Sequence, residues 1–274
     1  MWTDWRDAAR SLIRAPRFTA GAVLVLALGI GINVAVFTVA NATLFKGYRG
    51  VPDQDRLVYL TTGPDCCVSA QDVRDWSDAP ALSSTGAVAD LRVAVQVGEF
   101  DGVETATATE VLPGTFGVLR VAPVLGRDFT AADAVAGAPP VTILSHDYWR
   151  ARFGGDAAVI GRVIRVNGAP ATVVGVMPEA FAFPQFQMLW MPWVDTPARR
   201  PRNVRGFWFA VARLADGATI EQARTQTETI GERMRREHPD TNARITPWVQ
   251  PFRELFFGKS VVAEVYPSIF RNRY

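Results

Sequence analysis

The sequence is poor in residues that build metal centres and redox sites. Its 274 residues include two histidines, His146 and His238, and no cysteine or histidine lies at ligand spacing from either. The pattern excludes a zinc framework, and we expect neither a metal nor a cofactor.

Cysteine is equally scarce. The two cysteines are neighbours, Cys66 and Cys67, and adjacent cysteines close a disulfide only with strain. Three interpretations are open: a vicinal disulfide, an intermolecular link and two idle thiols. We prefer the idle thiols.

An excess of charge of one sign is also absent. Lysine and arginine number 29 against 27 acidic residues, a formal net charge of +2, so no nucleic-acid partner is expected. No G-x-x-x-x-G-K-[ST] motif occurs, and Gly29–Ile30–Gly31 follows no strand. The chain is therefore not itself a P-loop ATPase.

One charge-free stretch dominates the N-terminal part. No charged residue occurs from Phe18 to Phe45, and a helix of this length exceeds the bilayer's hydrocarbon core of about 30 Å. The alternative is a secretory signal cleaved at Ala40–Asn41–Ala42. The apolar region of a signal usually spans about 7–15 residues, so we predict a transmembrane helix over 18–45.

Residues 1–17 have the pattern of an amphipathic helix. Apolar side chains recur on one face: Trp2, Trp5, Ala9, Leu12 and Ile13. The pattern predicts an interfacial helix lying on the membrane, or else a helix packed on protein. A large polar domain after an N-terminal helix is usually translocated. We expect a cytoplasmic N-terminus, an inner-membrane anchor and a periplasmic or other extracytoplasmic location for the rest.

Small residues repeat within the predicted span. Ala27, Gly31 and Ala35 share one helical face, and Asn33 adds an amide that seeks partners in hydrocarbon. This favours a face that packs on other helices, although glycine and alanine are common in all such helices.

The remaining chain alternates short strands with few helices. Strands are predicted at Leu57–Thr61, Ala87–Val97, Val103–Val111, Val141–Leu144, Val159–Val166, Ala171–Val176, Phe207–Leu214 and Ile245–Val249. Helices are predicted at Ser69–Trp76, at Tyr148–Phe153, and from Thr219, capped with Gln222, to Pro239. Asn167–Gly168 predicts a type I′ hairpin turn.

These elements predict an α+β region built from two βαβ units with a strand-rich insert. The domain ranges are 1–17 for the interfacial helix, 18–45 for the span, and 46–258 for the exported region. Within the last, porter-like segments 50–98 and 206–252 enclose the insert 99–205, and 259–274 form an atypical tail.

An ordered series of motifs resembles FtsX-like permeases of ABC transporters with a MacB-type periplasmic core domain, of the group described from acidobacteria. The motifs run from residue 4 to 258 and include Asp4–Trp5–Arg6, Pro16–Arg17–Phe18–Thr19, Leu26–Ala27–Leu28–Gly29–Ile30–Gly31, Leu125–Gly126–Arg127–Asp128–Phe129, Arg152–Phe153–Gly154–Gly155–Asp156 and Val174–Gly175–Val176–Met177–Pro178.

The resemblance implies a permease that couples an ABC ATPase, supplied in trans, to export or efflux, with further permease helices and self-association among its contacts. Such permeases continue into three more spans after the position of Gly258. Here Lys259–Tyr274 carries several charges instead, so we expect an incomplete permease. The alternative is a single-pass extracytoplasmic interaction or scaffold protein without transport activity.

Enzymatic activity is not expected. Ser145–His146–Asp147 has the residue types of a catalytic triad, but three consecutive side chains cannot converge as a triad does. We expect Ser145 or Asp147 to cap the helix near Tyr148. Turn chemistry accounts for the carboxylates Asp128, Asp133 and Asp156.

An aromatic run forms a candidate partner-docking loop: Phe181, Phe183, Phe186, Trp190 and Trp193. The preferred alternative is that these rings close the end of the insert. The run is too rich in proline for a central strand. The arginines that follow, Arg199, Arg200, Arg202 and Arg205, predict a solvated basic loop rather than an anion site.

Overall fold

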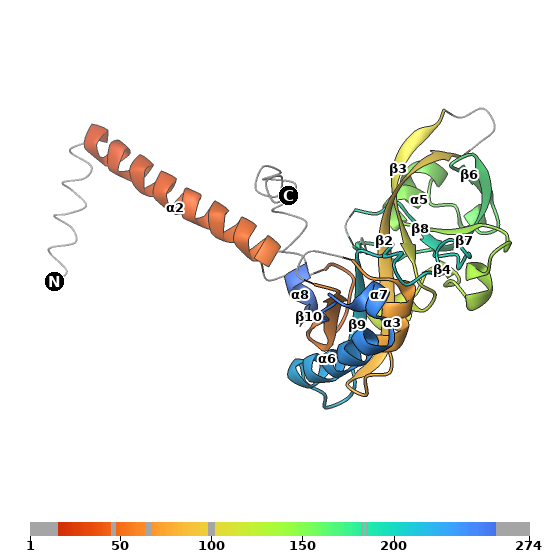
Figure 1. Cartoon of the computed structure of the whole chain (residues 1–274). Coiled ribbons are helices and arrows are strands. Elements are labelled where there is room, and N and C mark those ends of the chain that lie inside the picture. Colours follow the sequence, from red (N-terminus) through yellow and green to blue (C-terminus); the bar gives the residue numbers. More distant parts are fainter. Residues whose placement is uncertain are drawn as a thin grey trace. The chain divides into compact units, whose positions relative to one another are not determined.

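The computed structural model describes most of the chain. The described ranges are 16–44, 48–63, 67–97, 102–181, 183–184 and 186–255. The predicted interfacial helix and the tail thus lie almost wholly outside the described residues. The chain divides into two compact units, Met1–Gly47 and Tyr48–Tyr274, which we describe separately (Figure 1).

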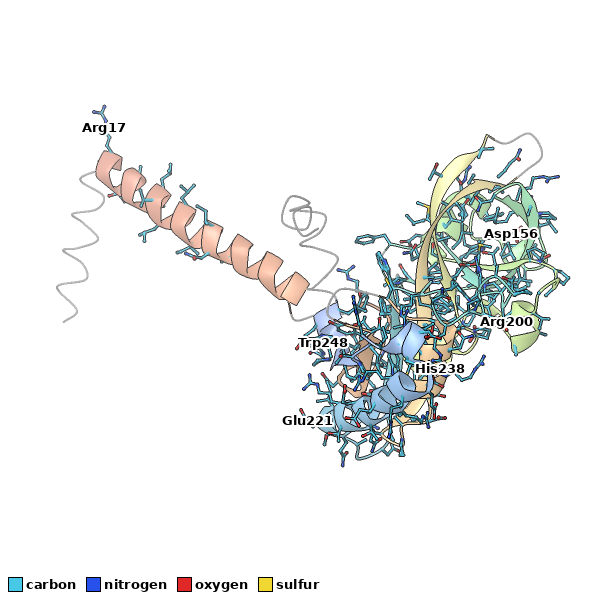
Figure 2. The ribbon with its side chains drawn as sticks, viewed as in Figure 1. Arg17, Asp156, Arg200, Glu221, His238 and Trp248 are labelled. Carbon is cyan, nitrogen blue, oxygen red and sulfur yellow. The ribbon has the colours of Figure 1, made fainter. Side chains whose placement is uncertain are left out.

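The first unit is the helix α2, Pro16–Leu44. Pro16 occupies its first position, where the missing N–H breaks no helical hydrogen bond, and Arg17 lies at the same end (Figure 2). Eight apolar side chains between Val23 and Val34 each expose more than half of their surface. Counting only described residues, no helix combines the length and apolar character needed to cross a membrane.

The second unit begins with a four-stranded sheet of order β10-β1-β9-β2, antiparallel throughout. The strands are β1 (Leu57–Thr61), β2 (Leu82–Gln96), β9 (Phe209–Leu214) and β10 (Trp248–Pro251). Strand β9 separates the two strands of the first βαβ unit, and β1 separates those of the second. The two predicted βαβ units are therefore present and interleaved, a split βαβ arrangement.

Helices α3 (Ala70–Trp76) and α6 (Ile220–Glu237) cover one face of this sheet. Both begin with the capping boxes that their sequences favour, Ser69 with Asp72 and Thr219 with Gln222. Their apolar side chains, including Trp76 and Met234, pack in one cluster with inward residues of β1, β2, β9 and β10. The short helix α7 (Pro239–Asn242) follows α6.

The insert closes into a six-stranded barrel. The pairings run in a ring, β2-β3-β8-β5-β7-β6 and back to β2. The added strands are β3 (Glu104–Val111), β5 (Val141–Leu144), β6 (Val163–Val166), β7 (Ala169–Val176) and β8 (Leu189–Pro192). Each strand of the ring supplies buried side chains to one cluster, which α5 (His146–Phe153) joins through Tyr148 and Phe153. Closure leaves no free edge on the ring.

A third apolar cluster lies on the face of the four-stranded sheet opposite α3 and α6. It is covered by α4 (Thr115–Leu119) and α8 (Phe252–Leu255) and contains Phe116, Phe183, Trp190 and Phe209. The cluster draws residues from both the sheet and the insert. The short elements β4 (Leu125–Gly126), η1 (Gln54–Arg56), η2 (Ala131–Ala134) and η3 (Ala157–Val159) complete the unit.

Local signals located most elements, and several predictions need correction. Strand β2 begins at Leu82 rather than Ala87, and β10 spans Trp248–Pro251 rather than Ile245–Val249. The hairpin turn is present, with φ of +50° at Asn167 and +80° at Gly168. Strand β6 starts only at Val163, because Asp156 caps the turn η3 and Gly161 has φ +86°. The aromatic run does contain a central strand: β8 pairs with β3 and β5, and its one proline, Pro192, is the last residue.

The cysteine interpretation is also corrected. Cys67 is disulfide-bonded, and the only other cysteine of the chain is its neighbour Cys66, which lies outside the described residues. The idle-thiol interpretation is therefore wrong for Cys67.

Asp133 should make folding stability depend on acid pH. Its carboxylate receives two hydrogen bonds from the Arg127 guanidinium, of 2.7 and 2.9 Å, and these lower its pKa to about 2. Because the pKa is lower in the folded state, the ionised carboxylate stabilises the fold above about pH 4. This contribution to stability is lost as pH falls towards 2. Replacing Asp133 with Asn should cost about 1–2 kcal/mol at pH 7 and flatten this dependence in urea unfolding.

Asp128 is the control, because burial raises the pKa of its carboxyl. Its ionisation therefore opposes folding, and Asp128→Asn should not lower stability at pH 7. Equal losses of unfolding free energy in the two variants would contradict a stabilising role for the Asp133 carboxylate.

Candidate functional site

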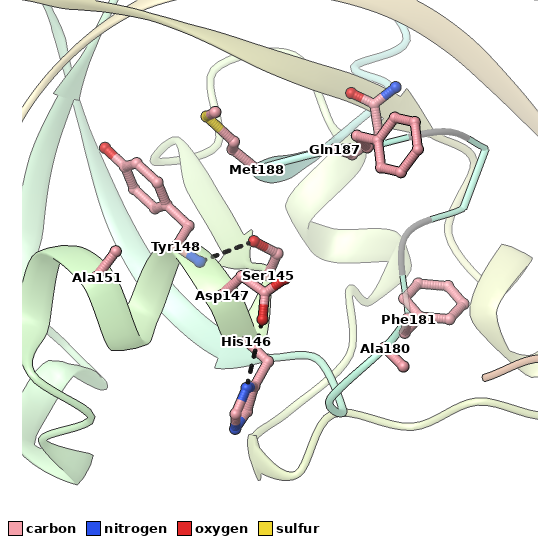
Figure 3. A pocket seen from close by; sticks show the side chains of 10 residues that line it. Ser145, His146, Asp147, Tyr148, Ala151, Ala180, Phe181, Gln187 and Met188 are labelled. Carbon is pink, nitrogen blue, oxygen red and sulfur yellow. Dashed lines mark hydrogen bonds and ion pairs between the residues drawn. The ribbon is translucent and has the colours of Figure 1, made fainter. Parts of the chain in front are cut away.

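A cavity of about 320 Å³ lies between the N-terminal end of α5 and the segment that precedes β8 (Figure 3). Its lining residues are Ser145, His146, Asp147, Tyr148, Ala151, Ala180, Phe181, Phe186, Gln187 and Met188. Two candidate groups that are separate in the sequence, Ser145–His146–Asp147 and the aromatic run, thus meet at one place. The sequence contains no signal for this meeting.

Ser145 acts as a helix cap in this cavity. Its Oγ accepts the N–H of Tyr148 at 3.2 Å, as predicted from the sequence. His146 Nδ1 lies 3.8 Å from Oδ1 of Asp147, whose side chain is 94% exposed. Ser145 Oγ therefore accepts a hydrogen bond from a backbone N–H, whereas the nucleophile of a triad donates a hydrogen bond to its base.

The wall opposite α5 is fixed by backbone hydrogen bonds. The N–H of Met188 donates to the Thr107 carbonyl and the N–H of Ser145 donates to the Met188 carbonyl, each at 2.9 Å. The Thr107 hydroxyl donates to the Phe186 carbonyl at 2.7 Å. Hydrogen bonds to β3 and to Ser145 thus hold the wall that faces α5 across the cavity.

The five rings of the candidate docking loop separate into two groups. Phe181, Phe183, Trp190 and Trp193 expose at most 6% of their surface, whereas Phe186 exposes 86%. Trp190 also donates its indole N–H to the Phe183 carbonyl at 2.9 Å. Four rings are therefore core side chains in this structure, and Phe186 alone remains available to a partner.

The buried rings contact residues near both ends of the described part of the second unit. Phe183 lies 5.2 Å from Tyr48 and 5.6 Å from Phe252 between ring centroids, and Tyr48 lies 5.0 Å from Phe252. We call Tyr48, Phe183 and Phe252 the chain-end cluster. Sequence analysis did not identify Tyr48 or Phe252, because neither belongs to a motif and only the pairing of β1 with β10 brings them together.

The arginine segment after β8 is not a solvated basic loop. Each guanidinium pairs with a carboxylate, and the pairs are Arg199 with Glu110, Arg200 with Asp195, Arg202 with Asp72 and Asp75, and Arg205 with Asp72. The carboxylates come from α3, β3 and the segment itself. The prediction failed because the sequence does not reveal that the segment crosses α3.

Asp72 is the centre of this network and is fully buried. Its Oδ2 accepts the N–H of Ser69 at 2.9 Å, and its Oδ1 lies 3.5 Å from Arg202 Nη1 and 3.3 Å from Asn242 Nδ2. The network thus ties α3 to α7 and to the return segment from the barrel. A buried carboxylate needs such partners, since an unpaired charge in the interior is costly.

The proposed helix-packing residues lie on α2. Ala27 and Gly31 are exposed, and a side-chain carbon added at Gly31 would meet nothing within 4 Å. Asn33 Nδ2 donates to the Gly29 carbonyl of its own helix at 2.8 Å, so its amide has a local partner. The side chain of Ala35 lies outside the described residues.

No group of three or more His, Cys, Asp or Glu side chains that could hold a metal ion occurs among the residues described.

The architecture defines a class of protein: an extracytoplasmic α/β domain with a barrel inserted in a split βαβ sheet, as in FtsX-like permeases of ABC transporters. The sequence matches the MacB-like periplasmic core domain over residues 19–230, and the chain belongs to that family.

Two solved structures share the fold. The periplasmic region of MacB from Actinobacillus actinomycetemcomitans is 14% identical, with a TM-score of 0.55 over 76% of this chain and 94% of that one. The extracellular domain of the noncanonic ABC-type transporter YknZ from Gram-positive bacteria is 14% identical, with a TM-score of 0.52 over 71% of this chain and 99% of that one. Comparison with curated protein sequences gives no significant match.

The Asp72 network should dominate the stability of the junction. Asp72→Ala removes the fully buried carboxylate of the network, takes from Arg205 its paired carboxylate and leaves Arg202 with Asp75, so it should lower the free energy of unfolding by about 3 kcal/mol. Urea unfolding followed by tryptophan fluorescence measures this loss.

Asp78→Ala is the matched control. Asp78 lies just beyond α3 and pairs with Arg233 at 3.0 Å, but its side chain is 60% exposed. Its loss should cost less than about 1 kcal/mol. A similar cost for the two variants would refute the central place of Asp72.

Proposed function

We propose that this chain is the extracytoplasmic core domain and first membrane helix of an ABC transporter permease. In this proposal the helix at 18–45 spans the membrane from a cytoplasmic N-terminus, and a separate ATPase supplies the energy for export or efflux. Ala27, Gly31 and Ala35 face other permease helices or a second copy of the chain.

The composition of α2 supports the membrane anchor. The stretch from Phe18 to Phe45 contains no charged residue, and the apolar side chains from Val23 to Val34 expose their surface on all sides of the helix. A helix that is apolar all round requires an apolar environment. The charge-free stretch from Phe18 to Phe45 in the sequence is long enough, as a helix, for a bilayer core of about 30 Å.

The convergence of the first and last described segments of the second unit is the single observation that carries the coupling role. Strand β1, which follows the N-terminal helix, starts beside the end of β10, and Val58 pairs with Pro251. The segments that flank the domain therefore join it at one edge of the sheet, where Tyr48 contacts Phe252. A movement of these segments acts on the domain at this single edge.

The insert receives this movement through Phe183 and its neighbour Phe181. Gly50 adopts φ +73° and passes so close to Phe181 that an added side-chain carbon would lie 3.2 Å from its backbone. Phe181 in turn lies 5.4 Å from Trp190 of β8 between ring centroids. A packed chain of rings thus connects the chain ends to the barrel, and packed cores transmit displacement because they compress little.

A single-pass interaction protein is the second candidate function. The exposed Phe186 beside a cavity favours it, because exposed aromatic side chains anchor protein interfaces. Purification from native membranes distinguishes the two candidates. Recovery of an ABC ATPase with the chain favours the permease, and recovery of extracytoplasmic partners alone favours the interaction protein.

The anchor is tested by placing a charge in α2. Leu28→Arg should release the protein from membranes on carbonate extraction, because arginine at a span's centre costs about 2.5–3.5 kcal/mol. Val103→Arg, at a residue that is 68% exposed in the domain, should leave the protein in the pellet. Retention of both variants would argue against the span.

The coupling role is tested at the chain-end cluster. Phe183→Leu keeps an apolar side chain but removes the ring contacts with Tyr48 and Phe252, so it should reduce the ATPase rate of the purified complex severalfold. Phe207→Leu is the control. Phe207 is equally buried, but it packs against Trp193 in the cluster beneath α3 and α6. Equal rates in the two variants would overturn the proposed route.

A further inference from the structure

The cavity beside α5 has the properties of a recognition site. We propose that it binds a segment of a partner protein that inserts one apolar side chain into the cavity and places an adjacent lysine or arginine at its rim. This goes beyond the transport role and does not depend on it, because the binding is a property of the domain itself.

The size and surface of the cavity suit an apolar side chain. Its volume of about 320 Å³ lies at the lower end of the range of about 300–1,000 Å³ for ligand pockets. Four of its lining residues are apolar besides Phe186: Ala151, Ala180, Phe181 and Met188. The cavity is therefore large enough for a side chain and too small for a folded element.

Phe186 remains exposed although its backbone is held in place. Its carbonyl accepts the Thr107 hydroxyl at 2.7 Å, and the next residues are bonded to β3 and Ser145. The ring is therefore 86% exposed on a residue whose backbone carbonyl is hydrogen-bonded to β3. An exposed aromatic ring next to an apolar cavity offers a partner the contact area of an interface anchor.

The charge at the rim selects the partner. Asp147 lines the cavity and is 94% exposed, and Glu179 is exposed next to Ala180. No arginine or lysine lines the cavity, and neither carboxylate forms an ion pair with an arginine among the described residues. Complementarity therefore favours a cation beside the apolar anchor.

The test uses methionine and histidine NMR signals of the full chain in lipid nanodiscs. The probe is a glycine-flanked peptide with a central Phe-Lys pair, and the comparison peptides carry Phe-Glu or Ala-Lys. We expect the Phe-Lys peptide to shift the signals of Met188 and His146. Met234 and His238, which lie outside the cavity, should not shift.

Variants separate the cavity from non-specific association. Phe186→Ala removes the exposed ring, and Ala151→Phe fills the cavity from an exposed position of α5. Each substitution should lower the affinity for the Phe-Lys peptide at least tenfold. Asp147→Asn should weaken it about two- to fivefold at low salt and less at high salt. Val103→Ala, which changes an exposed apolar residue elsewhere, should leave affinity unchanged.

Several results would overturn the proposal. They are equal binding of the Phe-Glu peptide, unchanged binding to the Ala151→Phe variant, or no shift with millimolar peptide. A shift caused as strongly by N-acetylphenylalaninamide would show a small-molecule site instead. A shift caused by anionic nanodisc lipid alone would show a lipid contact.

Discussion

The hydrogen-bond ladder of β2 joins the two halves of the extracytoplasmic domain. Its first part pairs with β9 of the split βαβ sheet, its second part pairs with β3, and its last residues pair with β6 to close the barrel. A hinge within β2 would leave backbone N–H and C=O groups unpaired, which is costly in a buried strand. The return segment after β8 is held as well, by Trp193 against Phe207 and by the arginine pairs around Asp72. Both connections between the sheet and the barrel are therefore held by hydrogen bonds, ring packing and ion pairs, and in the proposed role a displacement at Tyr48 and Phe252 would reach the barrel through them.

The aromatic rings of the segment before β8 are divided between the core and the surface. Burying a phenylalanine stabilises a fold by about 1.5–3 kcal/mol, and Phe181 and Phe183 contribute this to the cluster shared by the sheet and the insert. Phe186, a few residues further on, contributes almost nothing because its ring faces solvent. One short segment therefore supports the core on one side and presents a ring and a cavity wall on the other. A partner bound at the cavity would contact the segment that also contacts the chain ends, which gives a physical link between recognition and movement.

Much of the architecture was accessible from local signals. Strands β1 and β5 were predicted with their observed bounds, and α6 began at the predicted capping box, because periodicity and caps depend on a few neighbouring residues. Two of the failures share one cause, because the partners lie far away in sequence: β8 pairs with remote strands, and Asp72 precedes the arginines by more than a hundred residues. The third failure was local, since Cys67 was taken as a thiol from chain geometry alone. The cavity could not have been predicted, since α5 and its opposite wall meet only in the folded barrel.

The sequence by itself determined the charge-free N-terminal stretch, the alternation of strands and helices, the hairpin turn and the family resemblance, because each depends on composition or on spacing over a few residues. Only the tertiary structure decided that Tyr48, which precedes β1, meets Phe252, which follows β10, that four of five neighbouring rings are buried, and that Phe186 stands beside a cavity with an acidic rim. These features depend on pairings between distant segments such as β1 with β10 and β2 with β6. The side-chain pattern of a single segment specifies which face is apolar and leaves open which remote segment will cover it.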